Sequence, residues 1–338
     1  MLVGEYAPDD IYVLVDHNTA ESVLPRLQSL CRSLSGASII SVAPGDDNKT
    51  LDALSHIWRQ LSENGATRRS LLVNIGGGMI TDMGAFAAAT FKRGLRFINV
   101  PTTLLGAVDA AYGGKTGINF NGLKNEIGVF KKADAVIIST TFLTTLPHQE
   151  INSGYAEMIK HAMIADGDML AALLRSQPTD HDPETLLALV EQSSQVKTDI
   201  VNQDPEEKSI RKALNFGHTA GHAFEELALE RQSPIPHGYA VAYGMVVETI
   251  LSVIKKQFPI DRMRTLAAYV FKTYRAFPFT CDDYGRLVDL MRHDKKNHKA
   301  GDINFTLLKN VGEVEIDCTA TEQEITAAFD IYREELQK

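Results

Sequence analysis

The chain has 338 residues, with 44% hydrophobic residues, 23% charged residues and a formal net charge of -9. This length exceeds the size at which a single core usually stops growing, and the composition is that of a globular protein, so we expect two folded domains and no disordered chain. The negative charge disfavours nucleic acid as a partner, because nucleic-acid phosphates require a basic surface, although an acidic protein can still hold a local basic pocket.

The three cysteines, Cys31, Cys281 and Cys318, lie far apart and form no CxxC motif. The sequence therefore predicts neither a disulfide framework nor a cysteine-based zinc site, and it fits a reducing compartment. No segment reaches the roughly 18 apolar residues that cross a bilayer, and residues 1–10 carry acids and a proline in place of a basic stretch and an apolar run. We expect a cytoplasmic protein with no membrane partner.

Up to about residue 145, short apolar runs alternate with helical patterns. Residues 50–63, for example, place apolar side chains at helical spacing and leave a polar opposite face. The apolar runs are rich in β-branched residues and read as buried parallel strands, at Ile11–Val15, Ser38–Val42, Leu71–Ile75, Phe97–Val100 and Ala135–Ser139. The alternation predicts a doubly wound α/β domain over residues 1–148.

After Pro147 the strand signal nearly vanishes and long helical patterns follow. They lie at roughly Asn152–Ala165, Thr185–Asn202, Ala213–Glu230, Tyr239–Lys256, Arg262–Tyr274 and Gly285–His293. One short exception, Ile303–Leu308 with Glu313–Ile316, predicts a hairpin before a final helix from Thr321. We expect a mainly α-helical second domain over residues 149–338.

A glycine run, residues 76–78, stands between a predicted strand and an alanine-rich helix. Unpaired backbone N–H groups and the helix dipole favour phosphate there, and glycine lets the backbone approach a pyrophosphate closely. Thr81 stands where G-x-G-x-x-G requires its third glycine, so the run by itself fits a tight turn about as well as a dinucleotide site. Thr102 and Thr103 follow the next predicted strand, where ligands of open α/β sheets bind, although both also fit a helix N-cap.

His218 and His222 lie four residues apart, which places both imidazoles on one face of a predicted helix, as in many metal sites. Thr219 stands where a zinc protease has its glutamate, so the pattern does not support peptide hydrolysis. Catalytic zinc usually has three protein ligands, and His237 and Glu157 are further candidates in the helical half. Each residue alone is more often structural than ligating, but four such groups in one half of the chain favour a metal site.

The ordered motifs of the chain strongly resemble those of the 3-dehydroquinate synthase family of sugar-phosphate cyclases. The resemblance covers most of the chain, and it rests on the glycine run with Asp82, Pro101–Leu105, Asp109 with Gly113–Asn119, Lys124 with Asn125, Ala156–Lys160, Asn215–Thr219 with Gly221 and His222, His237 with Gly238, and Asp294–Lys296. It implies an N-terminal Rossmann-like parallel-sheet domain that binds NAD, followed by a helical metal-binding domain, with the active site in the cleft between them.

The same resemblance implies roles for individual residues. Glu157, His218 and His237 would bind a divalent metal, zinc or cobalt, and His222 would take part in substrate binding and proton transfer. The residues implied to bind NAD are Asp46, Lys49, Gly77, Gly78, Met79, Ile80, Thr81, Asp82, Thr102, Thr103, Asp109, Lys115, Lys124, Phe142, Leu143, Thr144 and Thr145. Those implied to meet substrate are Asp109, Lys115, Asn125, Lys160, Lys197, Arg211, Asn215, His222 and Lys296, with Arg93 reaching across from the other subunit of a homodimer.

The family's reaction belongs to the shikimate pathway and converts 3-deoxy-D-arabino-heptulosonate 7-phosphate into 3-dehydroquinate and phosphate. The resemblance implies transient oxidation by NAD, phosphate elimination, re-reduction, ring opening and intramolecular aldol closure, so NAD is regenerated and the enzyme is a lyase. Because this substrate is anionic at both ends, an acidic protein needs a local cationic cluster, here Lys115, Lys160, Lys197, Arg211 and Lys296.

Three alternatives stay open at this point. A sibling cyclase would act on another sugar phosphate with the same cofactor and metal, a metal-dependent polyol dehydrogenase would release NADH, and a non-catalytic dinucleotide-binding protein would turn nothing over. The chain also departs from the usual family pattern at Thr81, Ala110 with Ala111, Phe120 and Tyr239. These departures concern pyrophosphate approach and hydrogen bonding around the site, and they remove no implied metal ligand.

Overall fold

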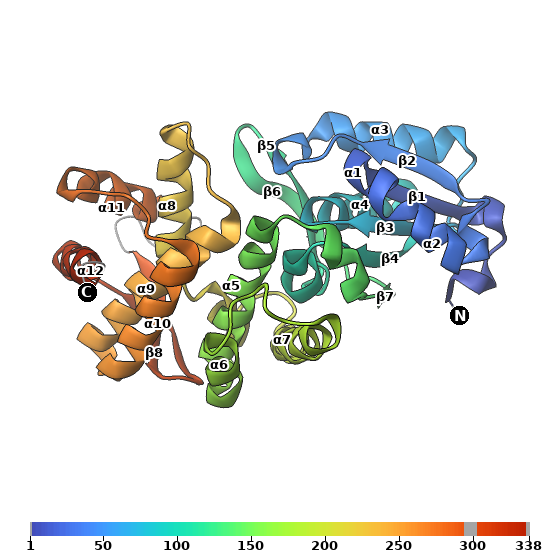
Figure 1. Cartoon of the computed structure of the whole chain (residues 1–338). Coiled ribbons are helices and arrows are strands. Elements are labelled where there is room, and N and C mark those ends of the chain that lie inside the picture. The colour runs from blue at the N-terminus through green and yellow to red at the C-terminus, as the bar shows by residue number, and fades with distance from the viewer. Residues whose placement is uncertain (1, 294–302, 336–338) are drawn as a thin grey trace. The chain divides into compact units, whose positions relative to one another are not determined.

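The computed structural model describes residues 2–293 and 303–335, and its chain divides into two compact units (Figure 1). The first unit comprises Met1–Pro147 with Leu186–Ser194, and the second comprises His148–Thr185 with Gln195–Lys338. The first is built around a parallel sheet and the second is mainly helical. The predicted fold class, an α/β part followed by an all-α part, is therefore confirmed.

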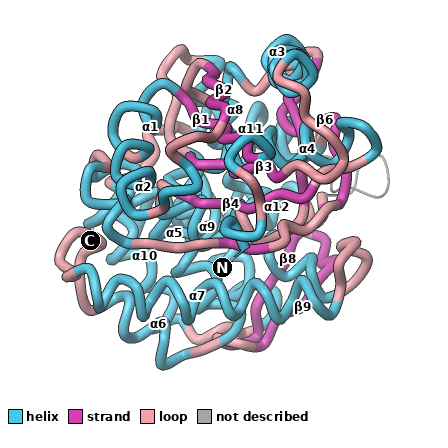
Figure 2. Tube along the Cα trace, turned by 90° about the vertical axis from the view of Figure 1, so that its right-hand side faces the viewer, coloured by secondary structure: helices cyan, strands magenta, loops and turns pink. Residues whose placement is uncertain are grey.

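The first unit contains a five-stranded sheet, of which β1 to β4 are labelled among the magenta strands in Figure 2. The strand order is β2-β1-β3-β4-β7, and every pairing is parallel. The strands are β1 (Ile11–Asp16), β2 (Ser38–Val42), β3 (Leu71–Gly76), β4 (Arg96–Pro101) and β7 (Ala135–Val136). The last strand is shorter than predicted, because Pro101 on its neighbour has no N–H group with which to continue the ladder. The strand order reverses between β1 and β3, which is where ligands of such sheets bind.

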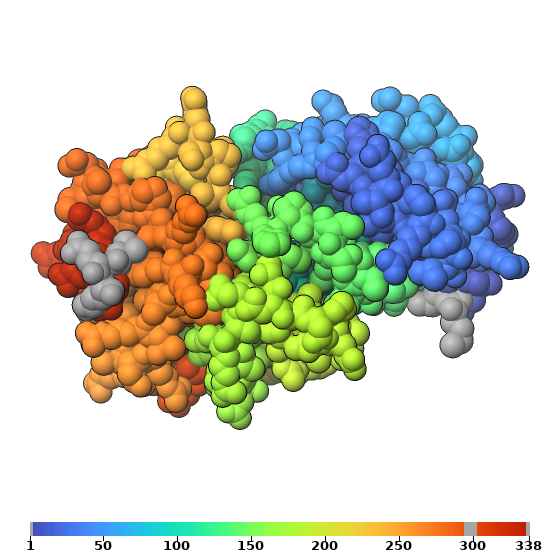
Figure 3. All heavy atoms as spheres, in the orientation of Figure 1, coloured from blue at the N-terminus to red at the C-terminus, as the bar shows by residue number. Residues whose placement is uncertain are grey.

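Helices cover both faces of this sheet. Tyr12 and Leu14 pack with side chains of α3 (Leu51–Glu63) and α4 (Gly78–Thr90), whereas Ile11 and Val13 pack on the opposite side with residues of α1 (His17–Ser22) and α2 (Leu24–Leu30). The outer surfaces of α1, α2 and α3 form part of the blue region in Figure 3. Successive side chains of a strand therefore pack into two cores on opposite faces of the sheet, which explains why the strands read as continuous apolar runs.

An antiparallel hairpin in the first unit was not predicted. It consists of β5 (Lys115–Phe120) and β6 (Leu123–Phe130), and every residue of β6 is exposed. Its turn is Asn121-Gly122, and both residues have positive φ angles. An Asn-Gly pair between two strands is a strong hairpin signal, so the turn could have been recognised from the sequence.

The second unit contains most of the helices and one hairpin. Its elements are α5 (His148–Ala165), α6 (Gly167–Leu174), α7 (Pro183–Gln203), α8 (His218–Glu230), α9 (His237–Lys256), α10 (Ile260–Tyr274), α11 (Tyr284–Arg292), β8 (Asn304–Asn310), β9 (Glu313–Thr319) and α12 (Glu322–Glu335). The central residues of α7, 186–194, group with the first unit. The predicted hairpin and final helix are confirmed, whereas α6 was not predicted.

The predicted start of one helix, Ala213, is wrong. Residues 210–215 form a 3₁₀ turn, η8, and α8 begins at His218. The break lies at Gly217, whose φ of 79° is left-handed and therefore outside the helical range. As a result His218 lies at the very N-terminus of its helix.

Helices α8 and α9 touch through their backbones. A Cβ on Gly244 would lie 1.9 Å from the carbonyl oxygen of Gly217 and 2.5 Å from the nitrogen of Gly221. A Cβ on Gly221 would lie 2.9 Å from the carbonyl oxygen of Ala240. Only glycine permits this approach, which brings side chains from the two helices together at their ends.

Helix α9 is, among the residues described, the one helix long and apolar enough to cross a membrane. Of its most apolar window, 78% is buried inside the structure. A buried core helix passes the same test of length and composition. We therefore read α9 as the central helix of the second unit.

Candidate active site

The glycine run lies at the carboxyl edge of the sheet in the first unit. It follows β3, and Gly77 is the N-cap of α4. The backbone N–H of Thr102 donates to the carbonyl of Gly76 over 3.0 Å, so the loops after β3 and β4 lie side by side. A Cβ on Gly77 would come within 2.9 Å of the Thr103 methyl carbon. The N–H groups of residues 78–80, at the start of α4, precede the first intrahelical hydrogen bond, from Thr81 to Gly77, and lie where the strand order reverses, as a pyrophosphate site requires.

Lys49 connects two other implied site residues of the first unit, Asp82 and Asn125. Its buried ammonium donates to the carboxylate of Asp82 over 2.7 Å and to the amide oxygen of Asn125. Asp46 and Lys124 lie 3.9 Å apart as a more exposed ion pair. These residues come from the turn η4 (Asp46–Asn48) with Lys49 after it, from α4 and from β6, so the structure brings them together from distant parts of the sequence. Asn125, implied to meet substrate, lies in this group with the residues implied to bind NAD.

The other implied residues of the first unit lie in turns or at strand ends. Asp109 belongs to the π-helical turn η6 (Gly106–Ala110), and Lys115 is exposed at the start of β5. Arg93 is exposed in the turn η5 (Phe91–Arg93). In η7 (Thr140–Thr145), Phe142 and Leu143 are buried, whereas Thr144 and Thr145 are exposed. Phe142 belongs to the core cluster that packs on the sheet.

The second unit brings Glu157, His218 and His237 together from three helices. One carboxylate oxygen of Glu157 lies 3.6 Å from Nε2 of His218 and 3.5 Å from Nε2 of His237. The three residues offer ligand atoms that all lie within 4.8 Å of one another. Glu157 is fully buried on α5, which is costly for a carboxylate unless cations or donors surround it. Two histidines and one glutamate are also a donor set of catalytic zinc sites.

Charges around this group act differently on the two imidazoles. Burial and the ammonium of Lys160, which pairs with Glu157, lower the pKa of His218 well below its usual value. Burial acts in the same direction on His237, but hydrogen bonds to Glu157 and Glu225 outweigh it and raise the pKa of His237 to about 10. Because a metal ligand must be a neutral imidazole, a cation at this place competes with the proton on His237.

Each imidazole is held by its other ring nitrogen. Nδ1 of His218 lies 3.1 Å from the carbonyl oxygen of Phe216, and Nδ1 of His237 lies 3.2 Å from the carboxylate of Glu225. Both contacts orient Nε2 toward Glu157, which is how metal-binding histidines are usually fixed. Sequence reasoning missed Glu225. Its spacing of seven residues from His218, two turns along the same helix face, was the available signal.

His222 lies beside the group but does not belong to it. Its ring centroid is 5.4 Å from that of His218 and 6.0 Å from that of His237. Among the residues that the structure describes, the potential ligand group around His218 includes His237 and Glu157, and not His222. The two histidines of the i, i+4 pair are therefore in different positions relative to the carboxylate.

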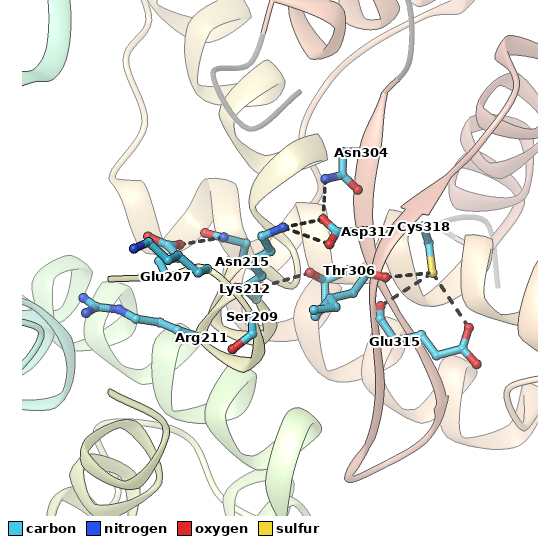
Figure 4. Close-up of polar contacts among 12 residues, drawn as sticks. Glu207, Ser209, Arg211, Lys212, Asn215, Asn304, Thr306, Glu315, Asp317 and Cys318 are labelled. Carbon is cyan, nitrogen blue, oxygen red and sulfur yellow. Dashed lines mark hydrogen bonds and ion pairs between the residues drawn. The ribbon is translucent and has the colours of Figure 1, made fainter. Parts of the chain in front are cut away.

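Arg211 and Asn215 lie at the two ends of one short segment, η8. The guanidinium of Arg211 donates to the carbonyl of Pro205 over 2.6 Å, and the amide of Asn215 donates to Glu207 over 2.8 Å. In Figure 4 Lys212 points toward β9, where it pairs with Asp317 over 2.8 Å, and Arg211 extends the opposite way. The hairpin thus anchors one side of η8 and leaves Arg211 on the other.

Three further implied cations, Lys160, Lys197 and Lys296, belong to the second unit. Lys160 on α5 and Lys197 on α7 are both buried. Lys296 lies outside the described residues. The ammonium of Lys160 pairs with the buried carboxylate of Glu157.

The chain matches known proteins along nearly its whole length. Residues 39–153 match the family description 3-dehydroquinate synthase N-terminal, and residues 154–297 match 3-dehydroquinate synthase C-terminal. A 3-dehydroquinate synthase from Parabacteroides distasonis is 50% identical over 326 residues, which cover 96% of this chain and 92% of the relative. The chain belongs to the 3-dehydroquinate synthase family. It is therefore an enzyme of that family, as the sequence motifs predicted.

Solved structures with the same fold carry the cofactors that the sequence predicted. 2-Deoxy-scyllo-inosose synthase, solved with carbaglucose-6-phosphate, NAD+ and Co2+, aligns with a TM-score of 0.84 at 23% identity, covering 98% of this chain and 93% of that one. 2-Epi-5-epi-valiolone synthase from Streptomyces hygroscopicus, with NAD+ and Zn2+, aligns with a TM-score of 0.82 at 22% identity, covering 98% and 94%. At this identity the likeness establishes the fold, and the ligands belong to those proteins.

Asp204 organises the loop that carries Arg211. Its buried carboxylate accepts hydrogen bonds from the backbone N–H groups of Lys208 (3.0 Å), Ser209 (2.6 Å) and Arg211 (3.1 Å). Burial acts to raise the pKa of Asp204, but these hydrogen bonds outweigh it and lower the pKa to about 2. The ionised carboxylate therefore stabilises the folded loop.

We expect Asp204→Asn to lower the urea midpoint of unfolding near neutral pH. Because the folded pKa lies below the unfolded value, the contribution of this carboxylate is complete above about pH 4 and is lost as the pH falls toward about 2. The difference in midpoint between wild type and variant should accordingly shrink as the pH is lowered through that window. Urea titrations of both proteins at several pH values measure it, and a difference that does not vary with pH would contradict the prediction.

Proposed function

We propose that the chain is a 3-dehydroquinate synthase that uses NAD and a divalent metal to convert 3-deoxy-D-arabino-heptulosonate 7-phosphate into 3-dehydroquinate and phosphate. The observation that carries the proposal is the convergence of Glu157, His218 and His237 in a chain of this family. When bound, NAD would accept a hydride and return it within each turnover, and the metal would acidify hydroxyl groups of the substrate.

We propose that residues 1–148 form the domain that binds NAD. Its support is the glycine run at the reversal of strand order, with no side chain on Gly77 or Gly78 to keep a pyrophosphate from the N–H groups of α4. The carboxylate of Asp82 lies in the first turns of the same helix, fixed by Lys49. Acceptor oxygens at this place suit the ribose hydroxyls of a dinucleotide.

We propose that residues 149–338 form the domain that binds metal and substrate. Glu157, His218 and His237 would hold the cation, because their ligand atoms come from three helices, two of them in backbone contact. Lys160 lies beside Glu157, so its ammonium would meet an anionic group bound near the metal. Lys197, Arg211 and Lys296 would hold the carboxylate and phosphate ends.

His222 would move protons in the reaction. Its ring lies within about 6 Å of both metal-site imidazoles by ring centroid, close enough to reach a molecule bound there. An imidazole that is not occupied by metal can accept and return a proton near neutral pH. Asn215 would contribute amide hydrogen bonds to substrate hydroxyls, positioned by its contact with Glu207.

We further propose a homodimer in which Arg93 serves the partner's site. Leu123 and Phe130 on β6 are 56% and 57% exposed, and a second copy could cover such apolar side chains. Arg93 is exposed in the turn η5, so its guanidinium is accessible to a second copy. Sedimentation equilibrium should then give twice the chain mass of 37.2 kDa, and a single-chain mass would contradict it. Cytoplasmic location and the lack of nucleic-acid and membrane partners stay predictions.

The proposed reaction is tested by incubating the metal-loaded protein with NAD and the heptulosonate phosphate. We expect phosphate to be released in step with substrate loss, without accumulation of NADH, because the cofactor is regenerated in each cycle. Steady growth of reduced nicotinamide absorbance would instead indicate a polyol dehydrogenase. Phosphate release only from another sugar phosphate would indicate a sibling cyclase, and no reaction with either would indicate a non-catalytic protein.

A further inference from the structure

We propose that Glu248 is a positioning residue of the metal site. Its carboxylate, on α9, binds the N-terminus of α8 and thereby fixes His218 relative to His237. The inference rests on the metal ligation proposed above, and it adds a residue that touches neither metal nor substrate.

The contacts of Glu248 surround His218 in the sequence. One of its carboxylate oxygens accepts the N–H of Gly217 over 2.7 Å, and the other accepts those of Thr219 over 2.9 Å and Ala220 over 3.1 Å. Glu248 is fully buried. The peptide groups on both sides of His218 are therefore held by one side chain from a neighbouring helix.

Helix α8 obtains from Glu248 a cap that its own sequence does not supply. An α-helix leaves its first N–H groups without intrahelical partners, and a Ser, Thr, Asp or Asn at the N-cap usually accepts one of them. The N-cap of α8 is Gly217, which has no side chain. A carboxylate at this end also meets the positive pole of the helix dipole, and hydrogen bonds to a charged acceptor are stronger than neutral ones.

Because Glu248 lies on the same helix as His237, this cap also connects the two histidines of the proposed metal site. His237 begins α9 and Glu248 follows eleven residues later, about three turns along, so both lie on the same face of the helix. That face packs against α8 through the contact of Gly244 with Gly217 and Gly221. Glycine contacts have no interlocking side chains, so they bring the helices close without fixing how far one is shifted along the other.

Two carboxylates fix that shift from opposite ends. Glu225 of α8 holds the ring of His237 at the start of α9, and Glu248 of α9 holds the backbone around His218 at the start of α8. Zinc–nitrogen bonds are about 2.0–2.1 Å long, so a small slide between the helices would take one Nε2 out of reach. The geometry thus points to Glu248 as the residue that sets the separation of the two ligands.

The inference is tested with the metal-free full-length chain, titrated with Co2+ and followed by the visible absorption of the bound ion. Glu248→Gln keeps the size of the side chain but turns one acceptor into an N–H2 group that faces backbone N–H donors. We expect Co2+ to bind at least about ten-fold more weakly, with an altered absorption spectrum, because the ligands are no longer held at one separation.

Ser252→Ala is the matched control on the same helix. The buried Ser252 hydroxyl accepts the N–H of Leu308 over 3.0 Å and donates to the backbone carbonyl of Glu248 over 2.7 Å. Its loss lowers thermal stability but leaves the Glu248 carboxylate and its hydrogen bonds to α8 in place. This variant should bind Co2+ with the affinity and spectrum of the wild type. Circular dichroism at the titration temperature verifies that all proteins compared are folded.

The Co2+ titrations distinguish a role of Glu248 in positioning the ligands from a general loss of stability and from failure of the proposed metal site. A folded Glu248→Gln variant with wild-type Co2+ affinity and spectrum would overturn the role of Glu248, and so would a loss equal to that of Ser252→Ala. If Glu248→Gln does not fold, Glu248→Asp takes its place, because its shorter carboxylate cannot reach all three N–H groups. Wild-type binding in Glu248→Asp would then overturn the inference. A wild-type chain that binds no Co2+ would overturn the proposed metal site itself.

Discussion

Replacement of His237 by alanine is expected to remove the bound metal and to lower kcat/KM by at least about a thousand-fold. Glu157 and His218 would remain, but two ligands hold a catalytic dication poorly where three are usual. Metal polarisation supplies several kcal/mol of transition-state stabilisation, and each 1.4 kcal/mol corresponds to about ten-fold in rate. Metal content per chain, measured by plasma emission after dialysis, and phosphate release measured on the same sample report both losses.

The matched control is His293→Ala, since the side chain of His293 is 74% exposed at the end of α11. It should keep wild-type metal content and activity. The metal content and activity of Glu225→Gln should lie between those of His237→Ala and His293→Ala. This variant removes only the carboxylate that orients His237, and such changes weaken metal binding by about 10–100-fold. Unchanged metal content in His237→Ala would reject His237 as a ligand.

Replacement of His222 by alanine is expected to leave the metal bound and to remove turnover. Its ring lies 5.4 Å from that of His218 by centroid, beside the ligand group and outside it. General acid–base catalysis contributes about 10²–10⁴-fold, so kcat should fall within that range. Metal content, kcat and the pH profile of kcat, measured together, distinguish this role from ligation.

Two results would contradict the role given to His222. Loss of metal in His222→Ala would show that His222 is itself a metal ligand. A fall in kcat with an unchanged pH profile would mean that the ring positions substrate and moves no proton. His222→Gln helps to separate these results, because it keeps a hydrogen-bonding side chain but cannot titrate.

The sheet of the first unit could be predicted from the sequence because each strand is buried on both faces. Residues of β1 alternate between two cores, so the run Ile11–Val15 is apolar without interruption. The hairpin of β5 and β6 could not be found in this way, since every residue of β6 is exposed and β5 buries only residues 116–118. Only its Asn121-Gly122 turn carried a local signal.

The candidate site was only partly predictable because its motifs are local and its geometry is not. The glycine run and the pair His218 and His222 are visible as short patterns. By contrast Glu225, Glu248 and Asp204 look like ordinary acids of a helix or loop in the sequence. Their roles depend on which backbone or imidazole lies opposite, and that is decided by how the helices pack.

What the sequence by itself determined is the class of each half, the place of the glycine run and the residue types available for a metal. Only the tertiary structure decided which of those residues lie together as a candidate metal site. An i, i+4 pair fixes that two imidazoles share a helix face, but the close backbone contact of α9 with α8 at Gly244 brings His237 to His218, and that of Gly238 with Ser153 brings up α5, which carries Glu157. Ligation requires side chains from three helices to meet at one point, and that distance is a property of packing, which no spacing along a single helix encodes.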